Sequence, residues 1–142
     1  MEARPDFPHP APNEQDAPFW EWCRRGQLRL QRCTACGAYR HHPRPRCPEC
    51  RASGYEWARV SGRGTVQSWT ICHPPVLPAF ESRAPYNAVV VGLDEGPYLV
   101  SNLVDCDDGA ITIGMEVEVT FVPVDDELTL PQFRPADPTT RR

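Results

Sequence analysis

Cys33-Thr-Ala-Cys36-Gly37 and Cys47-Pro-Glu-Cys50 are the two stretches that decide how this chain folds. Each is a Cys-x-x-Cys pair, and ten residues separate the two pairs. Two tight turns at this spacing can face each other and form a tetrahedral site of four thiolates, which suits zinc. We therefore predict one zinc ion bound by Cys33, Cys36, Cys47 and Cys50. Because four thiolates leave no open coordination position for water or substrate, we expect the zinc to be structural.

Two disulfide bonds are the alternative use of these cysteines. Adjacent Cys-x-x-Cys bridges are usually redox sites rather than cross-links, and nothing in the chain indicates an oxidising compartment. The first residues, Met-Glu-Ala-Arg-Pro, lack the apolar segment of a signal peptide, and no run of about 18 apolar residues is present to span a membrane. Seven cysteines, an odd number, then indicate a reducing cytoplasm.

The composition limits the architecture and the partners. A length of 142 residues allows one domain or two small ones, and 17 prolines favour loops over long helices. The net charge of −4 argues against general nucleic-acid binding. The basic residues are all arginine, so neither a Schiff-base lysine nor a P-loop lysine is available.

The N-terminal segment predicts a tail followed by a short helix. Residues 1–15 are rich in proline and read as a disordered tail or linker. Asp16 is a candidate N-cap, Pro18 suits a first helical turn and Gly26 suits a helix end, so a helix is predicted over about 17–25. This helix carries two tryptophans and a phenylalanine, which pack either in the chain's own core or on a partner.

The cysteine pairs are flanked by strand patterns. Residues 28–32 and 55–60 alternate between apolar and polar side chains, as strands do. Residues 16–60 are therefore predicted to form the helix and a rubredoxin-like zinc ribbon. A ribbon of this size has no full hydrophobic core, so its folding should depend on the metal.

The second half predicts a small β-barrel. Five strand-like runs are separated by turn residues, and helical periodicity is absent from this part of the sequence. This spacing favours a five-stranded OB-fold barrel over residues 61–136, with a disordered tail at 137–142. The fold class is thus mainly β. The five runs are 65–72, 87–93, 98–104, 115–124 and 128–133.

Charge and motifs exclude several functions. Eight arginines and one acid lie between Arg24 and Arg51, whereas ten acids and no base lie in residues 84–133. An acidic barrel would repel phosphate, so single-stranded nucleic-acid binding is only an alternative. A stand-alone hydrolase or lyase using His73 or a free cysteine is another, although neighbouring Cys72 and His73 should point to opposite faces of a strand.

The order of these features resembles the family of zinc-ribbon and OB-fold proteins, long described as a domain of unknown function, that accompany thiolase-like enzymes of acyl-CoA metabolism. The resemblance covers about residues 16–122. It is carried by Pro18-Phe19-Trp20, Leu28-x-Leu30-Gln31-Arg32-Cys33-x-x-Cys36-Gly37, Pro43-Arg44-x-x-Cys47-Pro48-x-Cys50, Ser61-Gly62-Arg63-Gly64-Thr65-Val66-x-Ser68-Trp69-Thr70, Pro85-Tyr86, Gly92-Leu93-Asp94-Glu95-Gly96 and Ile113-Gly114-Met115-x-Val117-x-Val119-x-Phe121.

The resemblance implies a non-catalytic accessory subunit. Family members look like partners of thiolases, of hydroxymethylglutaryl-CoA synthase and of thiolase-like aldolases. Some are fused behind a MaoC-type hydratase domain in steroid side-chain degradation, where they support a retro-aldol lyase acting on a steroid acyl-CoA. A pure scaffold that does not touch CoA is also compatible with the resemblance.

From this resemblance we expect the helix and the ribbon to dock on a dimer of the partner enzyme, giving a heterotetramer. The expected partner-binding residues are Phe19, Trp20, Arg44 and Arg46. The expected acyl-CoA-binding residues are Arg63, Trp69 and Tyr86.

Overall fold

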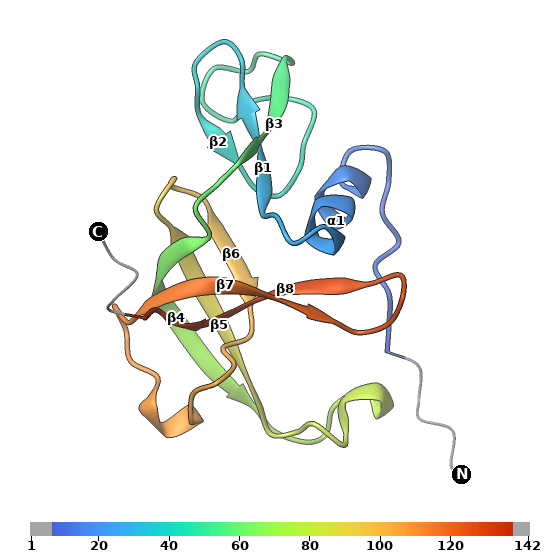
Figure 1. The fold of residues 1–142 in the computed structure, drawn as a ribbon, viewed down its shortest axis with the longest axis vertical. Helices are drawn as coiled ribbons and strands as arrows, with labels where there is room; N and C mark the ends of the chain where they lie inside the picture. The colour runs from blue at the N-terminus through green and yellow to red at the C-terminus, as the bar shows by residue number, and fades with distance from the viewer. Residues whose placement is uncertain (1–6, 138–142) are drawn as a thin grey trace.

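A three-stranded ribbon stands above a curled five-stranded sheet, and one short helix lies beside the junction of the two (Figure 1). This arrangement comes from a computed structural model that describes residues 7–137. The predicted mainly β fold, with its N-terminal helix, ribbon and OB-type sheet, is confirmed.

Helix α1 (Ala17–Arg24) begins without the predicted side-chain cap. Asp16 is the residue before the helix, as expected, but its carboxylate makes no capping hydrogen bond. The side-chain oxygen of Asn13 instead accepts the backbone N–H groups of Gln15 and Asp16 at 2.8 and 3.1 Å. The prediction of Asp16 as a capping side chain is therefore wrong, because Asn13 forms the turn that precedes the helix.

The end of α1 agrees with the sequence. Gly26 has φ of +75°, a left-handed conformation that favours glycine. Its N–H donates to the carbonyl of Cys23, and the N–H of Gln27 donates to that of Trp22, both at 3.0 Å. These two bonds satisfy carbonyl groups of the last helical turn, which would otherwise lack partners. No helix within residues 7–137 is both long and apolar enough to cross a membrane.

The ribbon consists of β1 (Arg29–Cys33), β2 (Tyr39–Arg40) and β3 (Tyr55–Arg59). Strand β1 lies in the centre and pairs antiparallel with both neighbours. The two predicted ribbon strands are confirmed to within one residue at each end. Such short strands enclose little apolar volume, so they need another source of stability.

The five-stranded sheet has the order β6-β5-β4-β7-β8, with antiparallel neighbours throughout. All five predicted runs form strands, and the third is shorter than predicted because the chain leaves the sheet after Ser101. Two 3-10 turns lie in the loops that follow β4 and β6. The bounds are β4 (Arg63–Cys72), η1 (Pro78–Phe80), β5 (Tyr86–Leu93), β6 (Tyr98–Ser101), η2 (Asp108–Ala110), β7 (Glu116–Pro123) and β8 (Thr129–Pro135).

The two edges of this sheet approach each other at one point, so the sheet is a partly closed barrel. Leu103 forms a parallel bridge with Phe133 on β8. The side chain of Asn87 on β5 holds the bridging segment from the other side. Its amide nitrogen donates to the carbonyl of Leu103 at 2.8 Å, and its oxygen accepts the N–H of Leu103 at 2.7 Å. Barrel closure therefore depends on a buried side chain as well as on strand pairing.

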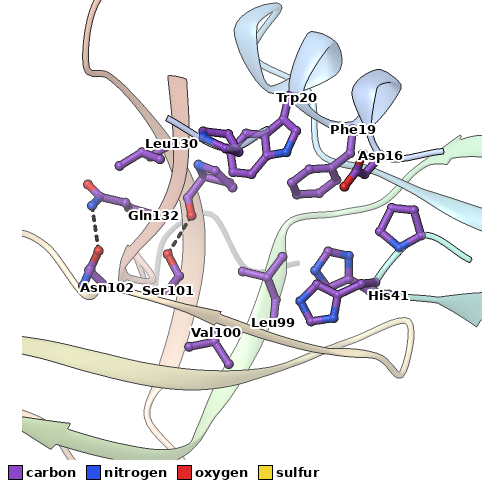
Figure 2. Close-up of a pocket in the computed structure, with 14 residues that line it drawn as sticks. Asp16, Phe19, Trp20, His41, Leu99, Val100, Ser101, Asn102, Leu130 and Gln132 are labelled. Carbon is purple, nitrogen blue, oxygen red and sulfur yellow. Dashed lines mark hydrogen bonds between the residues drawn. The ribbon is translucent and has the colours of Figure 1, made fainter. Parts of the chain in front are cut away.

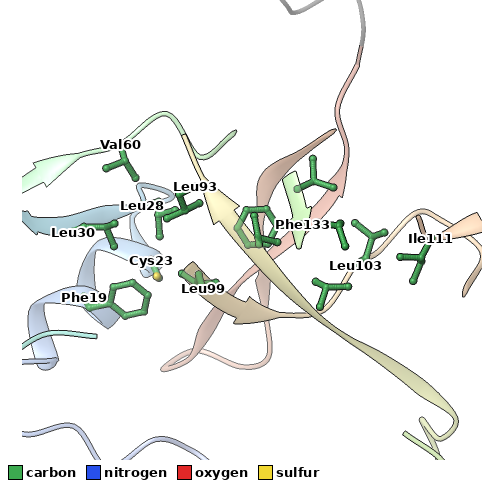
Figure 3. Packing of buried hydrophobic residues seen from close by; sticks show 14 residues of the cluster. Phe19, Cys23, Leu28, Leu30, Val60, Leu93, Leu99, Leu103, Ile111 and Phe133 are labelled. Carbon is green, nitrogen blue, oxygen red and sulfur yellow. The ribbon is translucent and has the colours of Figure 1, made fainter. Parts of the chain in front are cut away.

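One continuous apolar cluster joins the helix, the base of the ribbon and the barrel (Figure 3). Phe19 and Cys23 from α1 lie at one end with Leu28 and Leu30, and Phe133 lies inside the barrel. These side chains are removed from water almost completely. Burying such a set is the main favourable contribution to folding, and here it fixes the helix and the ribbon on the sheet.

The first described residues contact the barrel. The ring of Phe7 meets that of Phe80 edge-on, with 5.4 Å between their centroids. The Nε2 atom of His9 lies 2.6 Å from a carboxylate oxygen of Asp125. Residues 7–13 form no regular element, and these aromatic and polar contacts attach Phe7 and His9 to the barrel.

The predicted tails extend beyond the structure. Residues 1–6 and 138–142 lie outside the described residues.

Replacing Asn87 with alanine tests the role of this side chain in closing the barrel. The change leaves a buried N–H and a buried carbonyl of Leu103 without partners, so we expect a loss of about 2 kcal/mol in the free energy of unfolding. Urea denaturation of the zinc-loaded chain measures it. Thr70→Ala, at an exposed position on β4, is the control and should change stability by less than about 0.5 kcal/mol. Equal effects of the two variants would contradict the role given to Asn87.

Candidate metal centre and partner-binding surface

The four predicted cysteines come together at the tip of the ribbon. The sulfur atoms of Cys33, Cys36, Cys47 and Cys50 all lie within 4.8 Å of one another. The Cys33–Cys50 and Cys36–Cys47 sulfur pairs are 3.5 and 3.6 Å apart. These separations exceed the roughly 2 Å of a disulfide bond and match the edges of a tetrahedron around one zinc ion.

The two turns that carry the cysteines have the same backbone pattern. The carbonyl of Cys33 accepts the N–H of Gly37, and that of Cys47 accepts the N–H of Arg51, each at 2.9 Å. Gly37 has φ of +78° and Arg51 has φ of +65°. Gly37 can be predicted from the sequence as a turn residue with positive φ. Arg51 cannot, because arginine rarely adopts this conformation.

The backbone also prepares two of the four thiols, Cys33 and Cys47, to bind a metal. The N–H of Cys36 donates to the sulfur of Cys33 and lowers the pKa of this thiol to about 6. The N–H of Cys50 similarly lowers the pKa of Cys47. Thiolates, not thiols, bind zinc, so these donors favour the ligating form at neutral pH. The chain therefore carries one structural zinc site formed by these four residues.

Phe19 and Trp22, two of the three aromatic residues of α1, make close contacts with other residues of the chain. Phe19 is only 5% exposed and belongs to the core, so it leaves little surface for a partner. The guanidinium of Arg29 covers the ring of Trp22 at 3.9 Å. Trp20 is half-buried and meets Phe19 edge-on, with 5.2 Å between the ring centroids. Of the two expected helix residues, Trp20 is the one that is not fully buried, and it also packs against the core.

The two expected arginines lie in the loop that joins the cysteine turns. Arg44 and Arg46 are both exposed. The backbone N–H of Arg44 donates to the side chain of the buried Gln31 at 2.8 Å, and the guanidinium of Arg46 donates to the carbonyl of Arg51 at 3.3 Å. These bonds position the loop and leave both side chains at the surface.

The three expected ligand-binding residues do not form one site. Arg63 is the first residue of β4, whereas Tyr86 pairs with Cys72 at the opposite end of this ten-residue strand. Trp69 pairs with Val89, which lies three residues from Tyr86 on β5. Side chains an odd number of residues apart on a strand point to opposite faces of the sheet. Trp69 and Tyr86 therefore lie on different faces of the sheet, which a reading of the sequence in order does not reveal.

The structure also forms a cavity that sequence reasoning missed. It has a volume of about 350 Å³ and lies between α1, the loop after β2, and strands β6 and β8 (Figure 2). His41 lines it, stacked between Phe19 and His42 with ring centroids 5.2 and 4.2 Å away. Burial, together with the nearby His42 and Arg44, lowers the pKa of His41 to about 4. His41 is thus a neutral, partly buried ring at neutral pH, and it is not part of the four-cysteine cluster.

Comparisons with known proteins agree with this architecture. Residues 20–56 match the family described as "ChsH2, rubredoxin-like zinc ribbon domain", and residues 57–122 match "ChsH2, C-terminal OB-fold domain". A "DUF35 domain-containing scaffold protein" of Methanothermobacter thermautotrophicus is 38% identical over 72% of this chain and 77% of its own length. The chain belongs to the ChsH2/DUF35 family.

Two further relatives of this ChsH2/DUF35 chain are informative. One is a longer protein, and the other has a solved structure. A "Probable enoyl-CoA hydratase alpha subunit" of Thermomonospora curvata is 43% identical over 92% of the chain, and the chain spans 40% of that protein's length. The solved structure of the "Ltp2-ChsH2(DUF35) aldolase" contains a chain that is 42% identical and superposes with a TM-score of 0.83. The match covers 91% of this chain and 100% of that one. The ribbon, helix and sheet thus have the same arrangement in both.

Replacing Cys47 with serine should remove the zinc. One thiolate is lost, so the bound metal should fall from one per chain to near zero, and backbone amides of residues 29–59 should lose protection from hydrogen exchange. Metal analysis by mass spectrometry and exchange measurements test both results. Cys72→Ser, a matched control outside the cluster, should keep the zinc. A Cys47→Ser chain with full zinc content would refute the assignment.

Acidification should destabilise the chain partly through His41. Its pKa is lower in the folded chain than in the unfolded chain, so stability is complete above about pH 6.5 and falls as the pH drops toward 4. Between pH 7.5 and 5.5 the wild type should lose about 1 kcal/mol more than His41→Phe. Urea denaturation at both pH values, with zinc content checked at each, measures the difference. Equal losses would show that His41 does not titrate as described.

Proposed function

We propose that this chain is a non-catalytic accessory subunit that binds and supports a thiolase-like acyl-CoA enzyme, such as a thiolase or a retro-aldol lyase. The observation that carries the proposal is the match, over nearly the whole chain, to a subunit of the Ltp2-ChsH2(DUF35) aldolase. The description of a DUF35 relative as a scaffold protein points the same way.

Five side chains are candidates for contact with the partner. Arg44 and Arg46 of the ribbon loop are exposed, Tyr98 and Val100 of β6 are 61% and 66% exposed, and Trp20 of α1 is half-buried. We propose that these five residues form one docking surface, and we use that name for them. Tryptophan, tyrosine and arginine are the side chains that most often contribute strongly to protein interfaces.

The zinc site serves this surface indirectly. The loop that carries Arg44 and Arg46 joins the two cysteine turns, so the metal fixes both of its ends. Without the metal the loop has only its few hydrogen bonds to keep its shape. We infer that the zinc contributes to partner binding by holding the loop, and that it takes no part in chemistry.

The finer features of the assembly are also proposals. We propose that the partner is a dimer that binds two copies of this chain, giving a heterotetramer, and that a MaoC-type hydratase belongs to the same system. The Thermomonospora relative, a hydratase subunit of which this chain spans 40%, supports the latter. We place the assembly in the cytoplasm, where the cysteines stay reduced, and in the breakdown of steroid side chains or other lipids.

Contact with acyl-CoA is a separate proposal. Among the expected residues, Arg63 is half-buried at the start of β4, whereas Trp69 is 36% exposed. Because Trp69 and Tyr86 lie on different faces of the sheet, they would touch one acyl-CoA molecule only if the partner enzyme completes the site. Protection of either residue by acyl-CoA in the assembled complex would support this.

Trp20→Ala tests the docking surface. The chain is co-expressed with the thiolase-like enzymes of its own organism, and the complex is purified and titrated. We expect the wild-type chain to co-purify with one of these enzymes and the variant to bind it with a dissociation constant about 30-fold higher, the loss typical of a central tryptophan. Trp69→Ala is the matched control, since Trp69 lies on β4 outside this surface. Failure of the wild-type chain to associate would refute the proposed function. Equal binding by both variants would refute only the surface.

A further inference from the structure

The cavity beside α1 has the features of a binding site for a small group. Its walls come from the helix, the loop after β2 and the edge strands of the sheet (Figure 2). Its volume of about 350 Å³ lies within the range of ligand pockets, which are mostly apolar with a few placed polar groups. Leu99, Val100, Leu130 and Pro131 supply the aliphatic part of the lining.

Asp16 is the polar group that this cavity leaves without a partner. Its carboxylate makes no capping bond to α1, because Asn13 forms the preceding turn. Its Oδ1 atom is shielded from water and accepts no hydrogen bond from the described chain. The Asp16 side chain as a whole is only partly buried and lines the cavity, so its carboxylate remains available to a donor bound there.

Aromatic rings surround the space next to this carboxylate. Trp20, Phe19, His41 and His42 all line the cavity, and Phe19 contacts both Trp20 and His41. The faces of aromatic rings attract cations, tryptophan most strongly.

The charges of the lining favour one sign of ligand. Among the described residues that form the walls, Asp16 is the one with a formal charge, and it is negative. The low pKa of His41 keeps this ring uncharged at neutral pH, so it does not repel a cation. An anionic group would meet the Asp16 carboxylate without a compensating positive charge in the walls.

We propose that this cavity binds an organic cation, namely an ammonium group carried on an apolar stem or ring. The ammonium donates to Asp16 and lies among the aromatic rings, and the apolar part contacts Leu99, Val100 and Leu130. A free amine and a lysine side chain presented by another protein share this chemistry. The cavity shares Trp20 and Val100 with the docking surface, but the test below uses this chain without a partner, so it can fail while the proposed function stands.

Two probes of equal shape test the charge requirement. The zinc-loaded chain is titrated with 2-(1-naphthyl)ethylamine and with the neutral 2-(1-naphthyl)ethanol at pH 7 and 0.15 M salt. Binding is followed by the NMR shifts of the Trp20 indole and of the backbone amides of residues 99–102. We expect the amine to bind at least about tenfold more tightly, the difference typical of a hydrogen bond to a charged partner.

Two variants of equal net charge locate the effect. In Asp16→Asn the preference for the amine should fall to about one, whereas Glu14→Gln, which removes an exposed acid outside the cavity, should keep it. Trp20→Leu should weaken binding of the amine more than binding of the alcohol, and it provides a second test if Asp16→Asn folds poorly. Nα-acetyl-lysine amide is titrated in parallel to separate the two sources of the cation. Binding of this compound supports a lysine side chain, and its failure beside a bound naphthyl amine supports a free aromatic amine.

Three results would overturn the proposal. They are the absence of shifts at residues 99–102, equal binding of amine and alcohol by the wild type, and an unchanged preference in Asp16→Asn. The last two would indicate that water satisfies Asp16, or that the preference comes from the general negative charge of the chain.

Discussion

The bonds from four thiolates to one zinc ion are the constraint on which the ribbon depends. The three ribbon strands are too short to enclose a core of their own, and the segment between the cysteine turns has little regular structure. The metal fixes both turns and therefore both ends of this segment. Since His41, Pro43, Arg44 and Arg46 all lie on it, the shape of the cavity and of the docking surface depends on a site that performs no chemistry itself.

The apolar cluster attaches the ribbon to the helix and to the barrel. Leu28 and Leu30 at the base of the ribbon pack with Phe19 and Cys23 of α1, and the cluster continues into the barrel. A helix of eight residues would not be stable alone, so its position is set by this packing. The helix, the ribbon and the sheet are consequently one structural unit in the described chain, although the sequence divides into two halves of opposite charge.

The division of charge has a simple consequence for partners. Arginines gather on the helix and ribbon, and acids gather on the sheet. Zinc with four thiolates carries a net charge of about −2, so some of the arginine balances the metal site. The remainder, which includes Arg44 and Arg46, is exposed. Exposed arginines of this kind suit a protein partner better than a nucleic acid strand crossing an acidic sheet. The cavity beside α1 shares Trp20 and Val100 with the docking surface, but the one formal charge among its described wall residues is negative.

The sequence by itself determined the zinc ligands, the ribbon strands and the five strands of the sheet. Each is encoded locally, by the Cys-x-x-Cys spacing, by alternation and by turn residues. Only the tertiary structure decided that Phe19 belongs to the core, that Asn87 closes the barrel, and that Asp16 and His41 face one cavity. These positions depend on contacts between segments far apart in the sequence, and a local pattern does not specify which side of a short helix or loop another segment will cover.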